Sequence, residues 1–280
     1  MDNSKIFNRR LLRMRRNRIA ARWAGYNFLK VEAAIRLADC LADIARSFPL
    51  ALELGCHKGE LADILGKEST LIQCDIAERM RPHIVCDEEL LPFAPDIFDL
   101  VASVLSLHHV NDFPGCLIQI QEVLKPDGLF IAILPGANTL IELRQSVTGA
   151  AVEQGFALSP RISPFVEVRD AGALMQRTGF ALPVINSETI TIEYDNALKL
   201  MQDLRGMGES NVLIEQFKHF TSRSHIAAVC DYYDTHFANG DGTIKATFEF
   251  ITVTGWKPHA SQQQAAKRGS GKMNLNQIFS

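Results

Sequence analysis

Short apolar runs alternate with helical patterns along the first half of the chain. Strands are predicted at 50–55, 69–75, 83–86, 98–107 and 129–136, and the run at 98–107 is apolar throughout. Helices are predicted between them at 61–67 and 116–128, the second closed by proline and glycine. Strands that are apolar on both faces and alternate with helices predict a parallel sheet covered by helices on both sides.

The pattern changes after Gly136. Helices are predicted at 138–155 and 170–180, followed by an alternating strand at 188–194, a mostly helical stretch at 195–243 with a polar loop at 205–211, and a long alternating strand at 244–256. We expect three parts, namely an N-terminal helical segment (1–45), an α/β domain (46–256) whose residues 195–243 form a helical lid insertion, and a mobile tail (257–280).

Composition restricts the class of protein. The chain has 280 residues, 47% of them hydrophobic and 22% charged, which suits one large globular α/β domain. The longest apolar runs are strand-sized, so we expect no transmembrane helix, although peripheral membrane association stays open. The six cysteines, at 40, 56, 74, 86, 116 and 230, show no CxxC or zinc spacing. They indicate reduced core cysteines in a cytosolic compartment.

Positive charge is concentrated at the N-terminus. Residues 1–30 contain nine Lys/Arg and one acid, a charge of +8. Because the whole chain has a net charge of −3, residues 31–280 carry a charge of −11. The stretch RRLLRMRRNR (9–18) is compatible with a mitochondrial presequence, with binding to an acidic partner or nucleic acid, or with a helix that pairs with acids of the main domain. The helical pattern continues to Ala42 without a break, which favours the last interpretation.

A glycine-containing turn follows the first predicted strand. LELGCHKGELA (52–62) lacks two of the glycines of a dinucleotide turn, GxGxxG, because His57 and Glu60 stand in their places. It departs from the S-adenosylmethionine pattern, acid-x-G-x-G-x-G, only at His57. Histidine visits positive φ more readily than most residues, so we expect the turn to keep its path, with the imidazole directed away from the cofactor or covering its methionine end.

Acidic residues after the next strands support a nucleoside cofactor. Asp75 ends the second strand, where a carboxylate can accept both ribose hydroxyls. Asp87 follows the third strand and is placed to bind an adenine amino group, and Glu53 can compensate a methionine ammonium. The predicted cofactor-binding residues are Glu53, Gly55, Cys56, His57, Gly59, Asp75, Ile76, Asp87, Glu88 and Ser103.

Several longer stretches make the chain similar to a known family. IFNRRLLRMRRNRIAAR, SVLSLHHVNDFPG, LMQDLRGMGESN and ITVTGWKPHASQQQAAKRGSGKMNL, with other segments, resemble class I methyltransferases of the family of mitochondrial complex I assembly factor 5 and its bacterial relatives. They are also similar to the biotin-pathway malonyl-carrier methyltransferase. Together these stretches span nearly the whole chain, and they are more specific than the glycine turn.

The resemblance carries expectations about structure and function. It implies a Rossmann-like, seven-stranded class I methyltransferase sheet whose last strand, 244–256, is antiparallel. It implies S-adenosyl-L-methionine as cofactor and a type 11 methyltransferase activity on a protein or on a small acidic or acyl substrate, without nucleic acid. Because the Arg-rich helix belongs to the family's core, 9–18 is not expected to be a presequence. A bacterial cytoplasmic protein is expected, or a protein of the matrix side if the source is a mitochondrion.

Two alternative functions remain open at this stage. The eukaryotic member of the family is regarded as an arginine hydroxylase acting on an iron–sulfur subunit of respiratory complex I, and a non-catalytic assembly chaperone is also compatible with the sequence. Hydroxylation requires an oxygen-activating group, but His108, His109 and Asp112 do not by themselves make a convincing two-histidine, one-carboxylate set, so no metal ligand is assigned.

The remaining candidate residues are assigned by position. His108 and His109 follow the fourth strand and are candidates for catalysis as a general base or in orienting the substrate. Arg144 and Arg205 are candidates for binding a carboxylate or an acidic peptide. Gly206 and Gly208 suit a mobile lid around Arg205.

Overall fold

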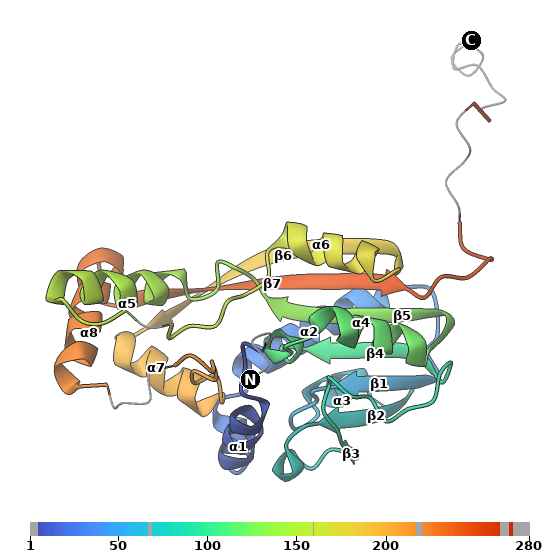
Figure 1. Cartoon of the computed structure of the whole chain (residues 1–280), viewed down its shortest axis with the longest axis horizontal. Coiled ribbons are helices and arrows are strands. Elements are labelled where there is room, and N and C mark those ends of the chain that lie inside the picture. The colour runs from blue at the N-terminus through green and yellow to red at the C-terminus, as the bar shows by residue number, and fades with distance from the viewer. Residues whose placement is uncertain (1–4, 67–68, 159, 217–220, 264–268, 271–280) are drawn as a thin grey trace.

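The computed structural model describes residues 5–66, 69–158, 160–216, 221–263 and 269–270. Seven strands within them form one sheet of order β3-β2-β1-β4-β5-β7-β6 (Figure 1). Their bounds are β1 (Leu50–Leu54), β2 (Thr70–Asp75), β3 (Ile84–Val85), β4 (Phe98–Val104), β5 (Leu124–Pro135), β6 (Ala181–Tyr194) and β7 (Ile244–Trp256). The pairs from β3 to β5 are parallel, and β7 is antiparallel to both β5 and β6. The expected seven-stranded class I methyltransferase sheet is confirmed.

Helices cover both faces of the sheet and extend beyond one end of it. The helices are α1 (Arg9–Ile19), α2 (Phe28–Ala42), α3 (Glu60–Leu65), α4 (Phe113–Val123), α5 (Ile141–Gln154), α6 (Val168–Arg177), α7 (Ala197–Gly206) and α8 (Arg223–Phe237). In Figure 1, α5, α7 and α8 lie together beyond the carboxyl ends of the parallel strands, and α1 lies between them and the sheet. The strand order reverses between β1 and β4, so this end of the sheet is where such folds bind ligands.

Alternation along the central strands divides the core into two layers. On β5, Ile131 and Ile133 pack in one cluster with α2, whereas Phe130 and Ala132 pack in the other with α4. All four side chains are completely buried. This is the pattern that a strand with helices on both sides requires, because successive side chains point to opposite faces.

Several element boundaries differ from the sequence prediction. The helix predicted over 116–128 ends at Val123, because Leu124 already pairs with Phe98 at the start of β5. The strand predicted from Glu188 begins at Ala181. The helical pattern that was expected to continue from residue 9 to Ala42 is interrupted by a 3₁₀ turn at Trp23–Gly25. Most of the predicted tail lies outside the described residues. No helix of the described ranges is long and apolar enough to cross a bilayer.

Candidate active site

The glycine turn after β1 adopts the conformation that its sequence requires. Gly55, His57 and Gly59 all have positive φ, at 66°, 53° and 93°. A Cβ added to Gly55 would lie 1.9 Å from Oγ of Ser106, so glycine is needed there both for the conformation and for the close approach. The left-handed conformation expected of His57 is present, at a strain cost of roughly 1–2 kcal/mol.

The His57 side chain is part of the packing around the turn. Its ring stacks on Trp23 with ring centroids 4.6 Å apart, and its Nδ1 lies 3.0 Å from the carbonyl oxygen of Gly55. The backbone N–H of His57 donates to Oδ2 of Asp75 at 3.1 Å. Burial holds the pKa of His57 well below 6.5, so the ring is neutral near pH 7. These contacts offset the strain of the left-handed backbone.

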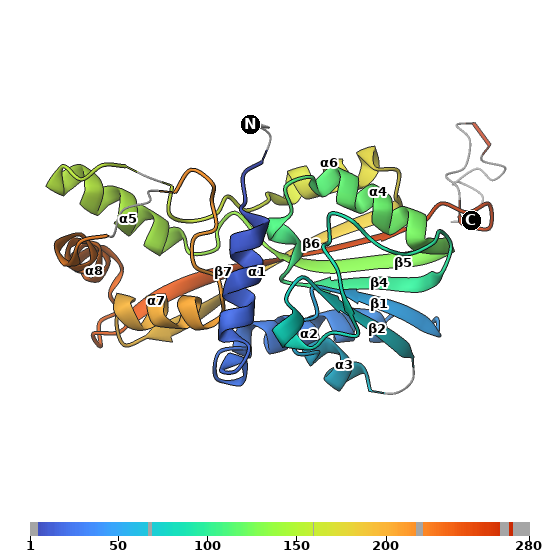
Figure 2. The same ribbon diagram turned by 60° about the horizontal axis from the view of Figure 1, so that its bottom comes forward.

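Asp75, the residue predicted to bind ribose, is paired with an arginine from α1. Arg16 Nη1 lies 3.3 Å from Oδ2 of Asp75, and Nη2 donates to Oγ of Ser106 at 3.0 Å. The same guanidinium is 3.6 Å from Glu88, and the Arg16 side chain is only 1% exposed. Figure 2 shows α1 lying across the carboxyl ends of the strands. A fully buried cation from the N-terminal helix therefore occupies the centre of the predicted cofactor site.

A second arginine of the same helix face neutralises the neighbouring acids. Arg9 Nη2 lies 2.6 Å from Oδ1 of Asp87 and also contacts Glu88. Burial alone would raise the pKa of Glu88, but Arg9 and Arg16 hold it below its ordinary value. The acid predicted to bind adenine is thus engaged by the chain's own side chain.

A buried lysine takes the backbone acceptors at the other end of the site. Lys30 of α2 donates from Nζ to the carbonyl oxygens of Gly55, at 2.7 Å, and Val104, at 2.6 Å. Beside it, Glu53 accepts from Nε2 of Gln73 at 3.1 Å, while its Oε1 is buried and has no partner among the described residues. Burial raises the pKa of Glu53 to about 7, although Lys30 opposes the shift.

The remaining predicted cofactor residues have mainly structural contacts. Cys56 and Ile76 are buried beside the turn, and Gly59 caps α3. Ser103 donates from Oγ to the carbonyl oxygen of Leu54 at 2.8 Å, which links β4 to β1. The acceptors expected to bind S-adenosylmethionine are therefore gathered at one edge, where Arg16 contacts Asp75 and Lys30 contacts the carbonyl oxygen of Gly55.

The raised pKa of Glu53 predicts a pH dependence of stability. A carboxyl group that ionises near pH 7 when folded and near 4.5 when unfolded stabilises the fold below pH 4.5, and this contribution is lost as pH rises towards 7. Glu53→Gln should therefore gain stability relative to the parent chain between pH 5 and pH 8, by roughly 2–3 kcal/mol at the upper end. Urea unfolding across that range measures it. The exposed acid Glu78 provides the control, and a gain in Glu78→Gln equal to that in Glu53→Gln would contradict the assignment.

The two candidate histidines meet a carboxylate that the sequence analysis did not single out. His108 and His109 lie in the 3₁₀ turn Leu107–His109, and their Nε2 atoms are 3.2 and 3.6 Å from Oε2 of Glu209, in the loop after α7. Asp112, the carboxylate considered from the sequence, instead caps α4 by accepting from the backbone N–H of Gly115 at 2.9 Å. The third member of the cluster thus comes from residue 209, far away in sequence.

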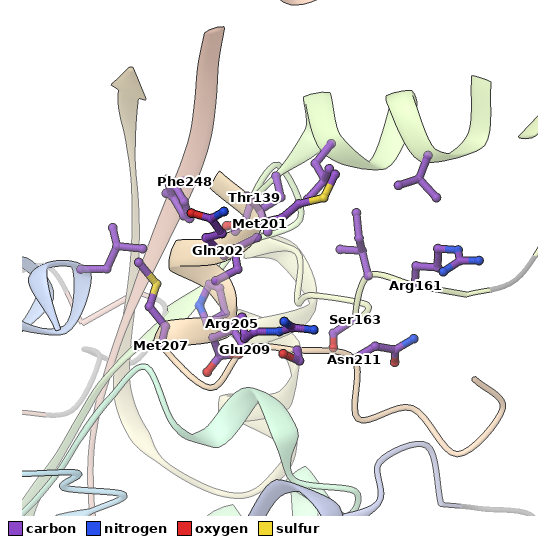
Figure 3. Close-up of a pocket in the computed structure, with 18 of the residues that line it drawn as sticks. Thr139, Arg161, Ser163, Met201, Gln202, Arg205, Met207, Glu209, Asn211 and Phe248 are labelled. Carbon is purple, nitrogen blue, oxygen red and sulfur yellow. The ribbon is translucent and has the colours of Figure 1, made fainter. Parts of the chain in front are cut away.

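A pocket of about 530 Å³ lies between the cofactor edge and the helical end of the molecule. Its wall is mostly apolar, with Trp23, Lys30, Leu105 and His108 on the side of the glycine turn. Figure 3 shows Arg205, Glu209, Ser163 and Asn211 among its polar lining residues. Arg205, a predicted substrate-binding residue, is thus one of the lining residues. Arg144, also expected to bind substrate, is not among the lining residues, although its guanidinium lies 5.9 Å over the ring of the lining residue Phe165.

Comparison with known proteins places the chain among its relatives. Residues 52–132 match the family described as "Methyltransferase domain". The mouse protein named "Arginine-hydroxylase NDUFAF5, mitochondrial" is 41% identical over 98% of this chain and 83% of its own length. The chain belongs to the NDUFAF5 family. The human NDUFAF5 is 40% identical over the same shares of the two chains.

More distant relatives agree with the fold. A malonyl-[acyl-carrier protein] O-methyltransferase of Methylovorus is 31% identical over 89% of each chain. The solved structure of YcgJ from Bacillus subtilis superposes with a TM-score of 0.56 at 17% identity, covering 80% of this chain and 98% of that one. A phosphoethanolamine N-methyltransferase from Haemonchus contortus in complex with S-adenosyl-L-methionine superposes with a TM-score of 0.51 at 14% identity, covering 86% of this chain and 57% of that one. The chain therefore combines a class I methyltransferase fold with membership of the NDUFAF5 family.

The expected pairing of the basic helix with acids of the main domain is confirmed by Arg9 and Arg16, whereas Lys30 and Glu209 were not singled out from the sequence. The sequence carried a signal for Arg9 and Arg16. Their spacing places both on the helix face of the apolar residues Leu12 and Ile19. A charged residue on an apolar helix face indicates a buried ion pair. Lys30 and Glu209 stand alone in their segments and gave no comparable signal.

Proposed function

We propose that this chain is an enzyme that binds S-adenosyl-L-methionine at the carboxyl edge of its sheet and methylates a substrate held in the adjoining pocket. The observation that carries the proposal is the set of acceptors at this edge, comprising the carboxylates of Asp75 and Glu88 and the carbonyl oxygens of Gly55 and Val104. In the described arrangement, cationic side chains of α1 and α2 satisfy all four. A nucleoside cofactor with an ammonium group offers the same kinds of donor.

Cofactor binding then requires α1 to move aside, and its packing is compatible with that movement. Leu12 belongs to a small apolar cluster with Phe7, Val212 and Leu213, separate from the two main cores of the sheet. Ile19, at the other end of the helix, does join a main core. The helix is therefore anchored at its C-terminal end, while its N-terminal part is held by the small cluster and by ion pairs.

The pocket indicates the class of substrate. Its wall is largely apolar, and Arg161 and Arg205 contribute positive charge beside Glu209. This suits an apolar group that carries an acid, such as an acyl chain, or a side chain of a protein substrate. The malonyl-[acyl-carrier protein] O-methyltransferase among the relatives agrees with the first choice. We place the chain in the bacterial cytoplasm, or on the matrix side if it is mitochondrial, as its NDUFAF5 relatives are named.

Arginine hydroxylation is the second candidate function. It agrees with the printed name of the relatives that are about 40% identical, and one structural observation favours it. The cluster of His108, His109 and Glu209 supplies two imidazoles and a carboxylate at the pocket. The protein substrate would then be an arginine-containing subunit of respiratory complex I. Mass spectrometry of the modified substrate distinguishes the two functions, because methylation adds one CH₂ group and hydroxylation adds one oxygen atom.

Isothermal titration with S-adenosylmethionine tests the cofactor proposal. Arg16→Met removes the guanidinium from the site, so more molecules are open and the apparent affinity should rise at least about tenfold. Asp75→Ala should weaken binding by roughly 1–3 kcal/mol, because a buried acceptor is lost. Arg13→Met, on the exposed side of the same helix, should leave the affinity unchanged. Absence of binding both in the parent chain and in Arg16→Met would refute a role for this cofactor.

A further inference from the structure

The cluster of His108, His109 and Glu209 is more than a pair of hydrogen-bonded side chains. One potential ligand atom from each residue lies within 4.8 Å of the others. The ring centroids of the two histidines are 4.0 Å apart. The Nδ1 atoms of both rings are buried without a partner among the described residues. Nε2 of His108 forms a hydrogen bond with Oε2 of Glu209 at 3.2 Å. The second imidazole, at 3.6 Å, converges on the same carboxylate oxygen without such a bond.

We propose that His108, His109 and Glu209 bind a divalent transition-metal ion at the edge of the pocket. Two imidazole nitrogens and one carboxylate oxygen are a ligand set that Fe²⁺, Mn²⁺, Co²⁺ and Zn²⁺ accept. Three protein ligands leave further coordination positions for water or substrate, as in catalytic rather than structural sites. His108 and Glu209 both line the pocket, so these positions are open to whatever the pocket holds.

The distances are close to those of a formed site. Ligand atoms bound at about 2.1 Å from an ion lie roughly 3–4 Å from each other. The Nε2 atoms of His108 and His109 are already 3.2 and 3.6 Å from Oε2 of Glu209. The three ligand atoms lie within 4.8 Å of one another, so side-chain rotation has to draw them closer around one ion.

The surrounding contacts hold the ligands in place. Phe7 packs edge-on against the His109 ring, with centroids 5.4 Å apart, and Arg9 Nη1 donates to the His109 carbonyl oxygen at 3.2 Å. The Glu209 side chain is 28% exposed, so an ion can enter from the solvent side of this carboxylate. Pre-positioned imidazoles and an accessible carboxylate are what a binding site requires before its ion arrives.

The metal ligands of this trio are different atoms from those proposed to bind S-adenosylmethionine. Neither histidine nor Glu209 contacts the acceptors at Asp75, Gly55 or Val104 in the bonds described above. A metal titration and a cofactor titration therefore examine different atoms, and either proposal can fail while the other stands. If both ligands bind, the metal is available to the second candidate function, which needs an oxygen-activating group.

The test uses the whole chain, freed of metal by a chelator and titrated with Co²⁺. We expect one ion to bind per chain, with visible absorption bands typical of nitrogen and oxygen ligands. Glu209→Gln and His108→Gln should each weaken Co²⁺ binding at least about 100-fold and alter the bands. His236→Gln, which changes an exposed histidine on α8 outside the pocket, should bind Co²⁺ like the parent chain.

Thermal unfolding gives a second measurement. An ion that binds only the folded state raises the melting temperature, so Co²⁺ should stabilise the parent chain and His236→Gln but neither variant of the trio. Circular dichroism without metal shows whether each variant is folded, and the second trio variant serves if the first is not. Undiminished Co²⁺ binding in a folded Glu209→Gln or His108→Gln, or its loss in His236→Gln, would overturn the proposal.

Discussion

Replacing Arg16 with methionine is expected to lower the free energy of unfolding by about 3–5 kcal/mol. The guanidinium lies 3.3 Å from Asp75 and 3.6 Å from Glu88, and neither carboxylate side chain is more than 1% exposed. Methionine keeps much of the side-chain volume and removes the charge. Two buried carboxylates then lose a cationic partner, and of the two only Glu88 keeps a second one, Arg9.

Urea unfolding near pH 7 measures this effect, and the same helix provides the control. Arg13 is 48% exposed and lies 3.9 Å from Glu78. Because exposed ion pairs contribute about 0–1 kcal/mol, Arg13→Met should be nearly neutral. Equal and small effects of the two substitutions would show that Asp75 and Glu88 do not depend on α1 and that the basic helix is a solvated face.

Substituting Gly55 by alanine is expected to cost about 3–5 kcal/mol of stability. Part of the cost is the left-handed backbone at φ +66°, which disfavours any side chain by roughly 1–2 kcal/mol. The remainder is overpacking, because the new Cβ would lie 1.9 Å from Oγ and 2.2 Å from Cβ of Ser106. Ser106, in the segment after β4, also accepts from Arg16, so this segment and the turn cannot separate without disturbing the buried ion pairs.

Gly155→Ala separates the two contributions. Gly155 has a similar φ, +67°, but an added Cβ would have nothing within 4 Å. Gly155→Ala should lower the stability only by the cost of the left-handed backbone conformation, roughly 1–2 kcal/mol. Thermal or urea unfolding of both variants gives the difference, and equal losses at the two positions would mean that Ser106 does not press on the turn.

The fold was predictable because its signals are local. Apolar runs of strand length, helical spacing and the alternating segment at 244–256 each depend on neighbouring residues, and the position of β7 followed from the family resemblance. Boundaries failed where tertiary pairing overrides local pattern, as at Leu124, which joins β5 instead of continuing α4. The proline and glycine that indicated the end of that helix belong to a strand.

The candidate site was predictable only in part. Gly55, Asp75 and Asp87 could be placed because each lies at or just after the end of a predicted strand, and the carboxyl ends of parallel strands meet at one edge. The partners of these residues come from α1 and α2, and nothing in the strands indicates which arginine or lysine reaches them. Glu209 lies about 100 residues after His108 in the sequence, so only the folded chain shows that they meet.

The attachment of α1 links the two proposed ligands thermodynamically. The backbone N–H of Asn8 donates to the carbonyl oxygen of Val212 at 2.8 Å, and that of Ile214 donates to Ile6 at 2.9 Å. The start of the helix is therefore joined to the loop that carries Glu209. An α1 that swings out to admit a cofactor pulls this loop away from His108 and His109. Occupation of one site then opposes occupation of the other, and by reciprocity each ligand lowers the affinity for the other by the same factor.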